Sequence, residues 1–309
     1  MSNQLSSLQI LKSLSDATSE LVKKLAPSIV NVHTRMTRGT GVVLTPDGYI
    51  VTCNHVLGRS AQVRIGLGEK TFEAKTVGFD PYSDVALLKA EEGNFKPVEL
   101  GDSDMLTTGQ FVLALANPFN RLPTATTGII TNVSATLRGW RSTAMDNVIA
   151  TDARLNPGFS GGPLVDVSGR MIGLNTAYVW QRGIAIPVNR VKGITDRLMT
   201  GGRLKRAYLG IVSNTVSIPQ EIASQARLDQ DTGVMIFQVE QGAPARKAGL
   251  TMGDVIVKFN TQPVTTFYDL PRLLTEDLVG KKATITILRG ERIAELTITP
   301  TEAEAETDD

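Results

Sequence analysis

The sequence predicts a mainly β protein with two domains, an all-β domain of a length suited to a pair of barrels and a smaller α+β domain after it. Along residues 28–187, short runs of Val, Ile, Leu and Thr alternate with many of the 28 glycines, a pattern typical of short strands joined by tight turns. After residue 206, strand-like runs alternate with short helical ones. A chain of 309 residues is also long enough for two domains that each bury a core.

The first 25 residues predict one amphipathic helix that ends before Pro27. Its apolar residues recur at helical spacing. They are Leu8, Leu11, Leu14, Leu21, Val22 and Leu25. Two interpretations stay open for this stripe, packing on its own domain or contact with another subunit.

Residues 26–200 are predicted to form the all-β domain. Pro46-Asp47-Gly48 and Ser168-Gly169 each fall between apolar runs, where these residue types suit hairpin turns. A helical stretch, VNRVKGITDRLM, closes the domain and stops at Gly201-Gly202, as a helix with a glycine C-cap does.

The basic residues 201–206 are predicted to be a linker, and residues 207–300 a small α+β domain. Its strand-like runs are TGVMIFQVE, DVIVKFN and ATITILRG, and its helical ones are QEIASQAR, ARKAG and FYDLPRLLTE. The tail, residues 301–309, is acidic with nothing to bury, which predicts disorder.

Composition excludes several classes of function. Charged residues make up 20% of the chain and the net charge is +1, so no nucleic-acid partner is expected. The single cysteine, Cys53, excludes an internal disulfide, and two histidines are too few for a metal cluster. No run approaches the roughly 20 apolar residues of a membrane span. The N-terminal residues lack the features of an export signal, so the expected location is the cytoplasm unless a signal or anchor segment was removed.

A candidate nucleophile lies in the segment NPGFSGGP. Glycines on both sides of Ser160 allow a strained loop in which the backbone N–H groups of Gly158 and Ser160 point at one spot. A serine attacks a carbonyl effectively only when a base takes its proton and such donors stabilise the oxyanion. By itself the motif equally fits an ordinary Gly-Ser turn.

Two further residues complete a candidate triad. His55 ends a strand-like run, where an imidazole is held by the barrel, and Asp84 precedes an apolar strand, where a carboxylate fixes the histidine tautomer. Taken singly, each also fits a structural role. The order His, Asp, Ser within an all-β domain matches the chymotrypsin-type arrangement and differs from that of α/β hydrolases, in which the serine comes first.

The chain resembles the HtrA/Deg serine proteases in several ordered stretches from about Ala26 to about Pro300. In the first domain these are GTGVVLTPDGYIVTCNHV, DVALLKA, ANPF, TTGIIT, TDARLNPGFSGGPLVD and GIAIPVN. In the second, YLGI and GAPARKAGLTMGDVIVKFN resemble a PDZ domain. The resemblance implies a trypsin-like double β-barrel followed by one C-terminal PDZ domain, no cofactor, and a homotrimer or a multiple of trimers that degrades unfolded polypeptides.

Carried over by position, the resemblance implies that His55 is the general base, Asp84 its orienter and Ser160 the nucleophile, with the oxyanion hole formed by the N–H groups of Gly158 and Ser160. Two residues depart from the family pattern. Phe159 replaces the usual Asn and is expected to place an aromatic ring beside the nucleophile, on the leaving-group side of the cleft. Arg154 takes the position that sets P1 charge preference in trypsin-like enzymes, so a trypsin-like preference is not expected.

The resemblance also implies two binding regions. The P1 side chain is expected to meet a mostly apolar pocket that accepts small aliphatic residues. Its walls are Arg154, Tyr178, Val179, Ile184, Ala185 and Ile186. The PDZ domain is expected to bind apolar C-termini of peptides along a sheet edge. The residues expected there are Tyr208, Leu209, Gly210, Ile211, Leu270 and Leu274.

Two functional hypotheses follow. The first is an active endopeptidase, and the alternative is a resting or proteolytically silent chaperone or scaffold that keeps the PDZ domain. The segment from Ala135 to Asn147, with Trp140 and Arg141, is expected to be a sensor loop that switches between such states.

Cys53 and His33 are interpreted as structural, with a redox role for Cys53 as the alternative.

Overall fold

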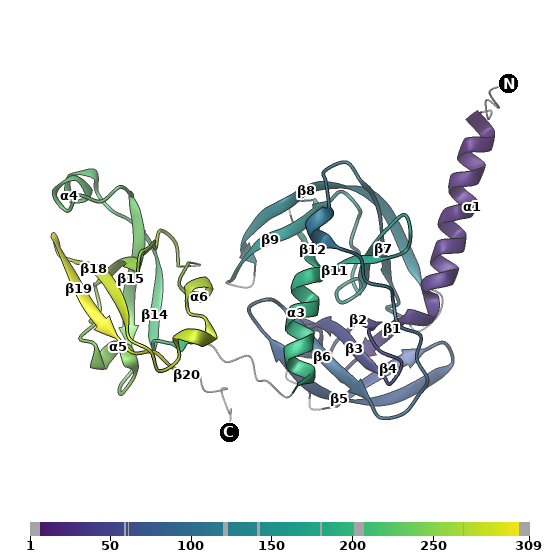
Figure 1. The fold of residues 1–309 in the computed structure, drawn as a ribbon, viewed down its shortest axis with the longest axis horizontal. Helices are drawn as coiled ribbons and strands as arrows, with labels where there is room; N and C mark the ends of the chain where they lie inside the picture. Colours follow the sequence, from purple (N-terminus) through teal and green to yellow (C-terminus); the bar gives the residue numbers. More distant parts are fainter. Residues whose placement is uncertain are drawn as a thin grey trace. The chain divides into compact units, whose positions relative to one another are not determined.

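The computed structural model describes residues 7–58, 60, 62–119, 123–140, 143–179, 181–200, 207–267 and 269–302. The chain divides into two compact units, Met1–Arg203 and Leu204–Asp309 (Figure 1). The linker expected at residues 201–206 lies outside the described residues.

The first half of the N-terminal unit is a closed six-stranded barrel with strand order β1-β2-β3-β6-β5-β4. Its strands are β1 (Ile29–His33), β2 (Arg38–Val43), β3 (Tyr49–Cys53), β4 (Val63–Leu67), β5 (Lys70–Asp80) and β6 (Val85–Ala90). The predicted turn at residues 46–48 joins β2 to β3, and Gly48 has the positive φ of +93° that such a turn needs. Closing the sheet removes its exposed edges and buries apolar residues such as Val30, Val51 and Leu87.

The second half is another closed barrel, with order β10-β11-β12-β9-β8-β7. Its strands are β7 (Phe111–Ala116), β8 (Thr124–Trp140), β9 (Thr143–Thr151), β10 (Pro163–Asp166), β11 (Met171–Val179) and β12 (Arg182–Pro187). The residues buried in its core cluster include Val112, Ile130, Ile149, Phe159, Leu164 and Ala185.

Helices border the barrels. Helix α2 (Asn54–Leu57) follows β3 directly, and α3 (Val188–Met199) follows β12. Helix α3 packs closely on β5, since a Cβ on Gly78 would lie 2.7 Å from Leu198 Cδ2. Two short 3-10 turns, Ala26–Ser28 and Ser103–Met105, complete this unit.

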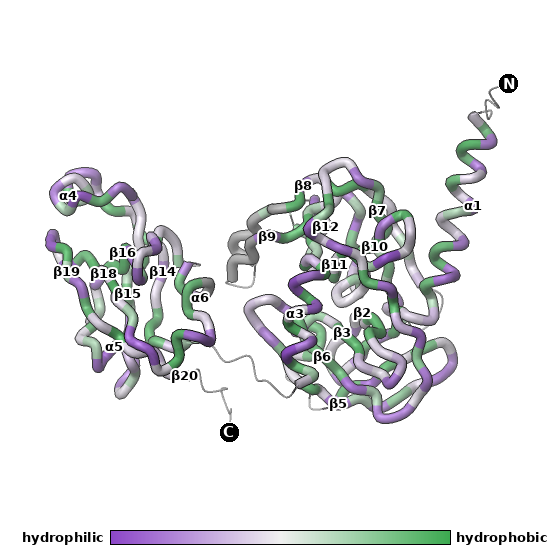
Figure 2. The backbone as a smooth tube through the Cα atoms, in the orientation of Figure 1, coloured by the Kyte–Doolittle hydropathy of each residue, from purple (hydrophilic) through white to green (hydrophobic). Residues whose placement is uncertain are grey.

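Helix α1 (Ser7–Leu25) contacts its unit at its C-terminal end, where Leu25 is buried and Leu21 approaches Gly169. Figure 2 shows hydrophobic and hydrophilic residues alternating along the helix. Leu8 is 77% exposed and Leu11 is 64% exposed. Contact between α1 and its own domain therefore accounts only for the apolar residues in the last turns of this helix.

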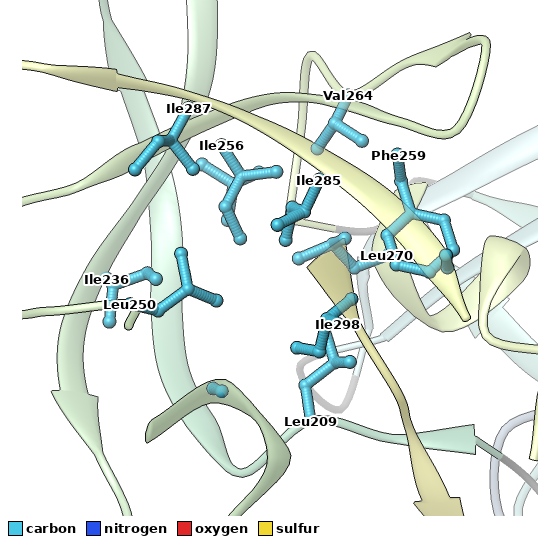
Figure 3. Close-up of a cluster of buried hydrophobic side chains, with 13 residues drawn as sticks. Leu209, Ile236, Leu250, Ile256, Phe259, Val264, Leu270, Ile285, Ile287 and Ile298 are labelled. Atoms are coloured by element: carbon cyan, nitrogen blue, oxygen red, sulfur yellow. The ribbon is translucent and has the colours of Figure 1, made fainter. Parts of the chain in front are cut away.

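The C-terminal unit is built on a sheet of order β14-β15-β16-β18-β19, with β17 paired to β16 and a separate pair, β13 and β20. The strands are β13 (Ala207–Tyr208), β14 (Ile211–Ser217), β15 (Thr232–Val239), β16 (Val255–Phe259), β17 (Gln262–Pro263), β18 (Ala283–Arg289), β19 (Arg292–Ile298) and β20 (Thr301–Glu302). The helices are α4 (Gln220–Gln225), α5 (Pro244–Lys247), α6 (Asp269–Leu273) and a 3-10 turn, Glu276–Leu278. Figure 3 shows the apolar core of this unit, in which Phe259 lies near Leu270 at one end and Leu250 lies near Ile236 at the other.

The predicted fold class, two barrels and a small α+β domain after an N-terminal helix, is confirmed. The sensor loop expected at residues 135–147 is wrong as a loop, because β8 and β9 extend through most of it as a hairpin. Arg141 lies outside the described residues. The tail begins later than expected, because Thr301 pairs with Tyr208 and Glu302 with Ala207, and residues 303–309 lie outside the described part.

Candidate active site

His55 and Asp84 meet at the edge of the first barrel. His55 lies on α2, immediately after β3, and Asp84 lies in the turn that enters β6. His55 Nδ1 and Asp84 Oδ2 are 2.7 Å apart, and the His55 backbone N–H donates to Asp84 Oδ1 at 2.9 Å. The pairing of β3 with β6 brings these two segments together. The bond to Asp84 Oδ2 orients the imidazole and favours the tautomer in which Nδ1 carries the proton.

The turn before β6 holds Asp84 in an unusual conformation. Asp84 has a φ of +57°, and its carbonyl accepts the N–H of Asn54 at 3.0 Å. Ser83 is fully buried and donates its hydroxyl to Asp80 Oδ2 at 2.6 Å. A non-glycine residue with positive φ persists where its surroundings over-determine it, as is common at functional sites.

Thr176 contacts both ends of the candidate triad. Its hydroxyl donates to Asp84 Oδ2 at 2.5 Å, and its backbone carbonyl accepts the hydroxyl of Ser160 at 3.0 Å. Sequence reasoning did not single out Thr176. The available signal was two polar residues, Asn175 and Thr176, in the apolar run of β11, where both are at most 1% exposed.

Ser160 lies in two consecutive turns, residues 156–162, which we call the double turn. The Phe159 N–H donates to the Asn156 carbonyl at 3.0 Å, and the Gly162 N–H donates to the Phe159 carbonyl at 2.9 Å. Gly158 and Gly161 have φ values of +91° and +84°, which suits the third position of type II turns. Among the described residues, no protein acceptor is found for the N–H groups of Gly158 and Ser160.

Those two N–H groups meet one requirement of an oxyanion hole, because donors that are fixed in a turn and lack a protein acceptor can receive a developing negative charge. Gly158 tolerates no side chain there, since a Cβ would lie 2.4 Å from Pro118 Cβ. The structure thus brings together all four predicted residues, His55, Asp84, Gly158 and Ser160, between the two barrels.

Phe159 lies elsewhere than expected. The ring is 1% exposed and belongs to the core cluster of the second barrel, so it does not line the cleft. The expectation of an aromatic wall beside the nucleophile is wrong, because burial in the apolar core is the more stable place for the ring.

The residues expected to form the P1 pocket are spread between surface and core. Arg154 and Tyr178 are exposed, and Val179 is partly exposed. The three residues of β12, Ile184, Ala185 and Ile186, are at most 4% exposed, and Ala185 packs in the core of the second barrel. Arg154 therefore presents its side chain at the surface, and the P1 preference stays a prediction.

Cys53 lies buried beside the triad. Its thiol donates to the Asn175 carbonyl at 3.2 Å. Burial raises the pKa of Cys53 well above its ordinary value, and the negative charge of Asp84 adds to this effect. Cys53, His55 and Asp84 each place one possible ligand atom within 4.8 Å of the others. These atoms are already used in hydrogen bonds within the protein.

The candidate peptide site of the C-terminal unit lies at strand β14, one edge of its sheet. The Phe267 N–H donates to Thr215 Oγ1 at 2.9 Å, which links the segment before α6 to this strand. Leu209 and Leu270 are buried in the core, whereas Ile211, Leu273 and Leu274 are partly buried around it. Of the expected apolar residues, Ile211 and Leu274 are therefore the partly accessible ones, and Leu273 lies beside them.

The loop before β14 is closely packed. Gly210 has a φ of +75°, and a Cβ there would lie 2.2 Å from Ala243 Cβ. Tyr208 donates its hydroxyl to Glu240 Oε2. A glycine is required at residue 210 for both conformation and space.

Comparisons with known proteins agree with this architecture. Residues 39–174 match a trypsin-like peptidase domain, and residues 209–299 match a PDZ domain. The chain is 36% identical over 268 residues to a Pseudomonas putida protein named "Probable periplasmic serine endoprotease DegP-like", which covers 84% of this chain and 55% of the relative. It is also 36% identical over 263 residues to the "Periplasmic serine endoprotease DegP" of Escherichia coli, over 82% of this chain and 55% of that one. The chain thus spans about half the length of these curated relatives.

Solved structures give the same result over nearly the whole chain. The "HtrA-type protease AlgW with tripeptide" superposes with a TM-score of 0.75 at 31% identity, covering 93% of this chain and 97% of that one. A serine endoprotease from Yersinia pestis gives a TM-score of 0.70 at 29% identity, with coverages of 93% and 98%.

The expected cytoplasmic location is contradicted by these comparisons, because the curated relatives are named as periplasmic proteins. The part of the chain that the structure describes holds no helix with the length and apolar character needed to cross a membrane.

Proposed function

Because this chain belongs to the HtrA-type serine protease family, we propose that it is a serine endopeptidase with His55, Asp84 and Ser160 as its catalytic triad. The observation that carries the proposal is that Thr176 is hydrogen-bonded to both Asp84 and Ser160, while Asp84 is hydrogen-bonded to His55. The backbone N–H groups of Gly158 and Ser160, which lack a protein acceptor, lie in the same double turn as Ser160. The triad order and the double barrel are those of a chymotrypsin-type site.

The reaction begins when Ser160 Oγ attacks the carbonyl carbon of the scissile peptide bond. The hydroxyl turns from the Thr176 carbonyl toward His55 Nε2, which takes its proton, while Asp84 accepts the hydrogen bond from Nδ1–H. The N–H groups of Gly158 and Ser160 stabilise the tetrahedral oxyanion. His55 then gives the proton to the leaving amine, and water hydrolyses the acyl-enzyme through the same groups.

Asp84 receives three hydrogen bonds in this scheme, from His55 Nδ1, from the His55 backbone and from Thr176. Three bonds of this kind hold the carboxylate in one place against the imidazole, where it stabilises the imidazolium as it forms. A proteolytically silent chaperone is not favoured, because the relatives are named serine endoproteases and the chain keeps His55, Asp84 and Ser160, with His55 hydrogen-bonded to Asp84.

The test is degradation of β-casein by the wild type and by Ser160→Ala at matched concentration. Cleavage by the wild type that is lost in the variant supports the proposal. Absence of cleavage by both proteins, each shown by light scattering and circular dichroism to be folded and intact, overturns it.

We also propose that the C-terminal unit binds apolar peptide C-termini, by addition of a strand to the β14 edge, and that the substrates are unfolded polypeptides. The change Gly210→Val places a side chain 2.2 Å from Ala243 Cβ at a positive φ. It is expected to lower the affinity for a fluorescent peptide ending in an apolar residue by at least about 10-fold. Fluorescence anisotropy measures the affinity, with Ser213→Ala as a folded control on the same strand. Unchanged affinity in the Gly210 variant contradicts this binding mode.

Two further proposals follow from the relatives and from α1. The relatives' names support a periplasmic location. The exposed leucines of α1, together with the family resemblance, support a homotrimer or a multiple of trimers. Sedimentation of the whole chain and of a chain with Leu8, Leu11 and Leu14 changed to Gln tests this, and an unchanged molar mass contradicts a role for α1 in assembly.

A further inference from the structure

We infer that Phe159 and Thr40 are positioning residues that hold the oxyanion donors in their working orientation, an inference that rests on the proposed function. Phe159 stands between Gly158 and Ser160, the residues whose N–H groups face the reacting carbonyl. Neither Phe159 nor Thr40 touches substrate. Their effect is on the two peptide planes of the double turn.

The Phe159–Ser160 peptide is oriented through its carbonyl. That carbonyl accepts the Gly162 N–H at 2.9 Å. Because a peptide unit is planar and trans, the Ser160 N–H must point in the opposite direction. Holding the Phe159 carbonyl therefore aims the Ser160 donor away from the protein interior, where no acceptor among the described residues takes it.

The Gly158–Phe159 peptide is held at both ends. Its carbonyl accepts the Thr40 hydroxyl at 2.7 Å, and its N–H donates to Asn156 at 3.0 Å. With this plane fixed and Gly158 at a φ of +91°, the preceding peptide, which carries the Gly158 N–H, has one accessible orientation.

Thr40 links the double turn to both barrels. It lies on β2 of the first barrel, and its N–H donates to the Ser160 carbonyl at 2.9 Å. Its Oγ1 also accepts the N–H of Asn117, just after β7 of the second barrel, at 2.9 Å. One threonine thus fixes the carbonyls on both sides of Phe159, and its hydroxyl uses both its donor and its acceptor capacity.

The Phe159 ring anchors the double turn in the core of the second barrel. It is 1% exposed and is among the largest fully buried side chains of the chain's described part. It packs in the same core cluster as Leu155 and Ile130. Burial of the ring fixes the position of the Phe159 Cα between the two peptides, and the loss of apolar burial opposes any movement of the double turn that displaces this residue.

The test uses two independent perturbations and one matched control. Phe159→Leu shortens the buried side chain, and Thr40→Val keeps the shape of threonine while removing both hydroxyl hydrogen bonds. Thr40→Ser restores the hydroxyl. The substrate is a fluorogenic peptide taken from the main β-casein cleavage site, and the inhibitor is the matching peptide aldehyde. Ser160 Oγ attacks the aldehyde carbon, so that the aldehyde oxygen faces the N–H groups of Gly158 and Ser160.

Phe159→Leu and Thr40→Val are expected to lower kcat by about 10- to 100-fold, less than the loss of a whole oxyanion donor. KM changes by less than about 3-fold, because ground-state binding does not use these donors. Inhibition by the aldehyde weakens in parallel with kcat, whereas affinity for the cleaved product peptide does not. Thr40→Ser stays within about 3-fold of the wild-type kcat.

The outcomes separate this inference from the proposed function. If the wild type is active and both Phe159→Leu and Thr40→Val fold and keep its kcat and its aldehyde affinity, the inference is overturned and the proposed function stands. A wild type that behaves like Ser160→Ala overturns the proposed function and the inference with it. If Phe159→Leu does not fold by near-ultraviolet circular dichroism, the Thr40→Val and Thr40→Ser pair decides. If kcat falls equally in Thr40→Val and Thr40→Ser, the inference is also overturned, because the hydroxyl that serine restores would then have no effect.

Discussion

Replacing Thr176 by valine should weaken the triad without changing its three residues. The Thr176 hydroxyl donates to Asp84 Oδ2 at 2.5 Å, and the Asp84 side chain is only 6% exposed, so water does not readily replace the lost donor. A hydrogen bond to a charged group contributes about 1.5–3 kcal/mol. We therefore expect the free energy of unfolding of the N-terminal unit to fall by about that amount.

The same change should lower kcat by about 10- to 100-fold, since each 1.4 kcal/mol of lost transition-state stabilisation is a factor of about ten. The imidazolium of the transition state depends on a correctly held carboxylate, whereas substrate binding does not, so KM should stay nearly constant. Urea denaturation and steady-state hydrolysis of the fluorogenic peptide measure the two effects.

Thr176→Ser is the matched control, because it keeps the hydroxyl and the backbone carbonyl that accepts from Ser160. It should recover most of both losses. Wild-type kcat and wild-type stability in Thr176→Val would refute the reasoning, because the hydroxyl would then not hold Asp84.

Two other predictions concern buried titratable groups. In the C-terminal unit, burial of Asp254 opposes ionisation, but hydrogen bonds from Arg289 and the Thr251 backbone, with the charge of Arg289, lower its pKa below the ordinary 3.8. This contribution to stability is present above pH 3.8 and lost as pH falls through the folded-state pKa. Asp254→Asn should therefore cost about 1–2 kcal/mol at pH 7 and less at pH 2 in urea unfolding, and an equal cost at both pH values contradicts the prediction. In the N-terminal unit, burial raises the pKa of Cys53, so iodoacetamide should modify the folded protein at least about 100-fold more slowly than the urea-unfolded protein at pH 8. Similar rates by mass spectrometry would show that the thiol is accessible.

Local patterns were sufficient to predict much of the fold. Short runs of Val, Ile, Leu and Thr separated by Gly and Pro turns predicted the strands, because strand preference and turn conformation are local properties of the chain. The turn at Gly48 and the helix over residues 188–199 were found in this way. The triad candidates were also accessible, since chemistry of this kind needs few residue types and their order in the chain is visible.

What the sequence by itself determined was therefore the class of fold, the division into a β domain and a smaller α+β domain, and the identity of His55, Asp84 and Ser160 as candidates. It did not determine where Phe159 points, because a residue beside a nucleophile can face the cleft or the core. Only the barrel closure placed the ring in the core, at 1% exposure. In the same way, Thr40 and Thr176 gained their contacts from strands that come together across 118 and 92 residues of chain, respectively. Contacts at such separations depend on the packing of two closed barrels, a property of tertiary structure that no local pattern encodes.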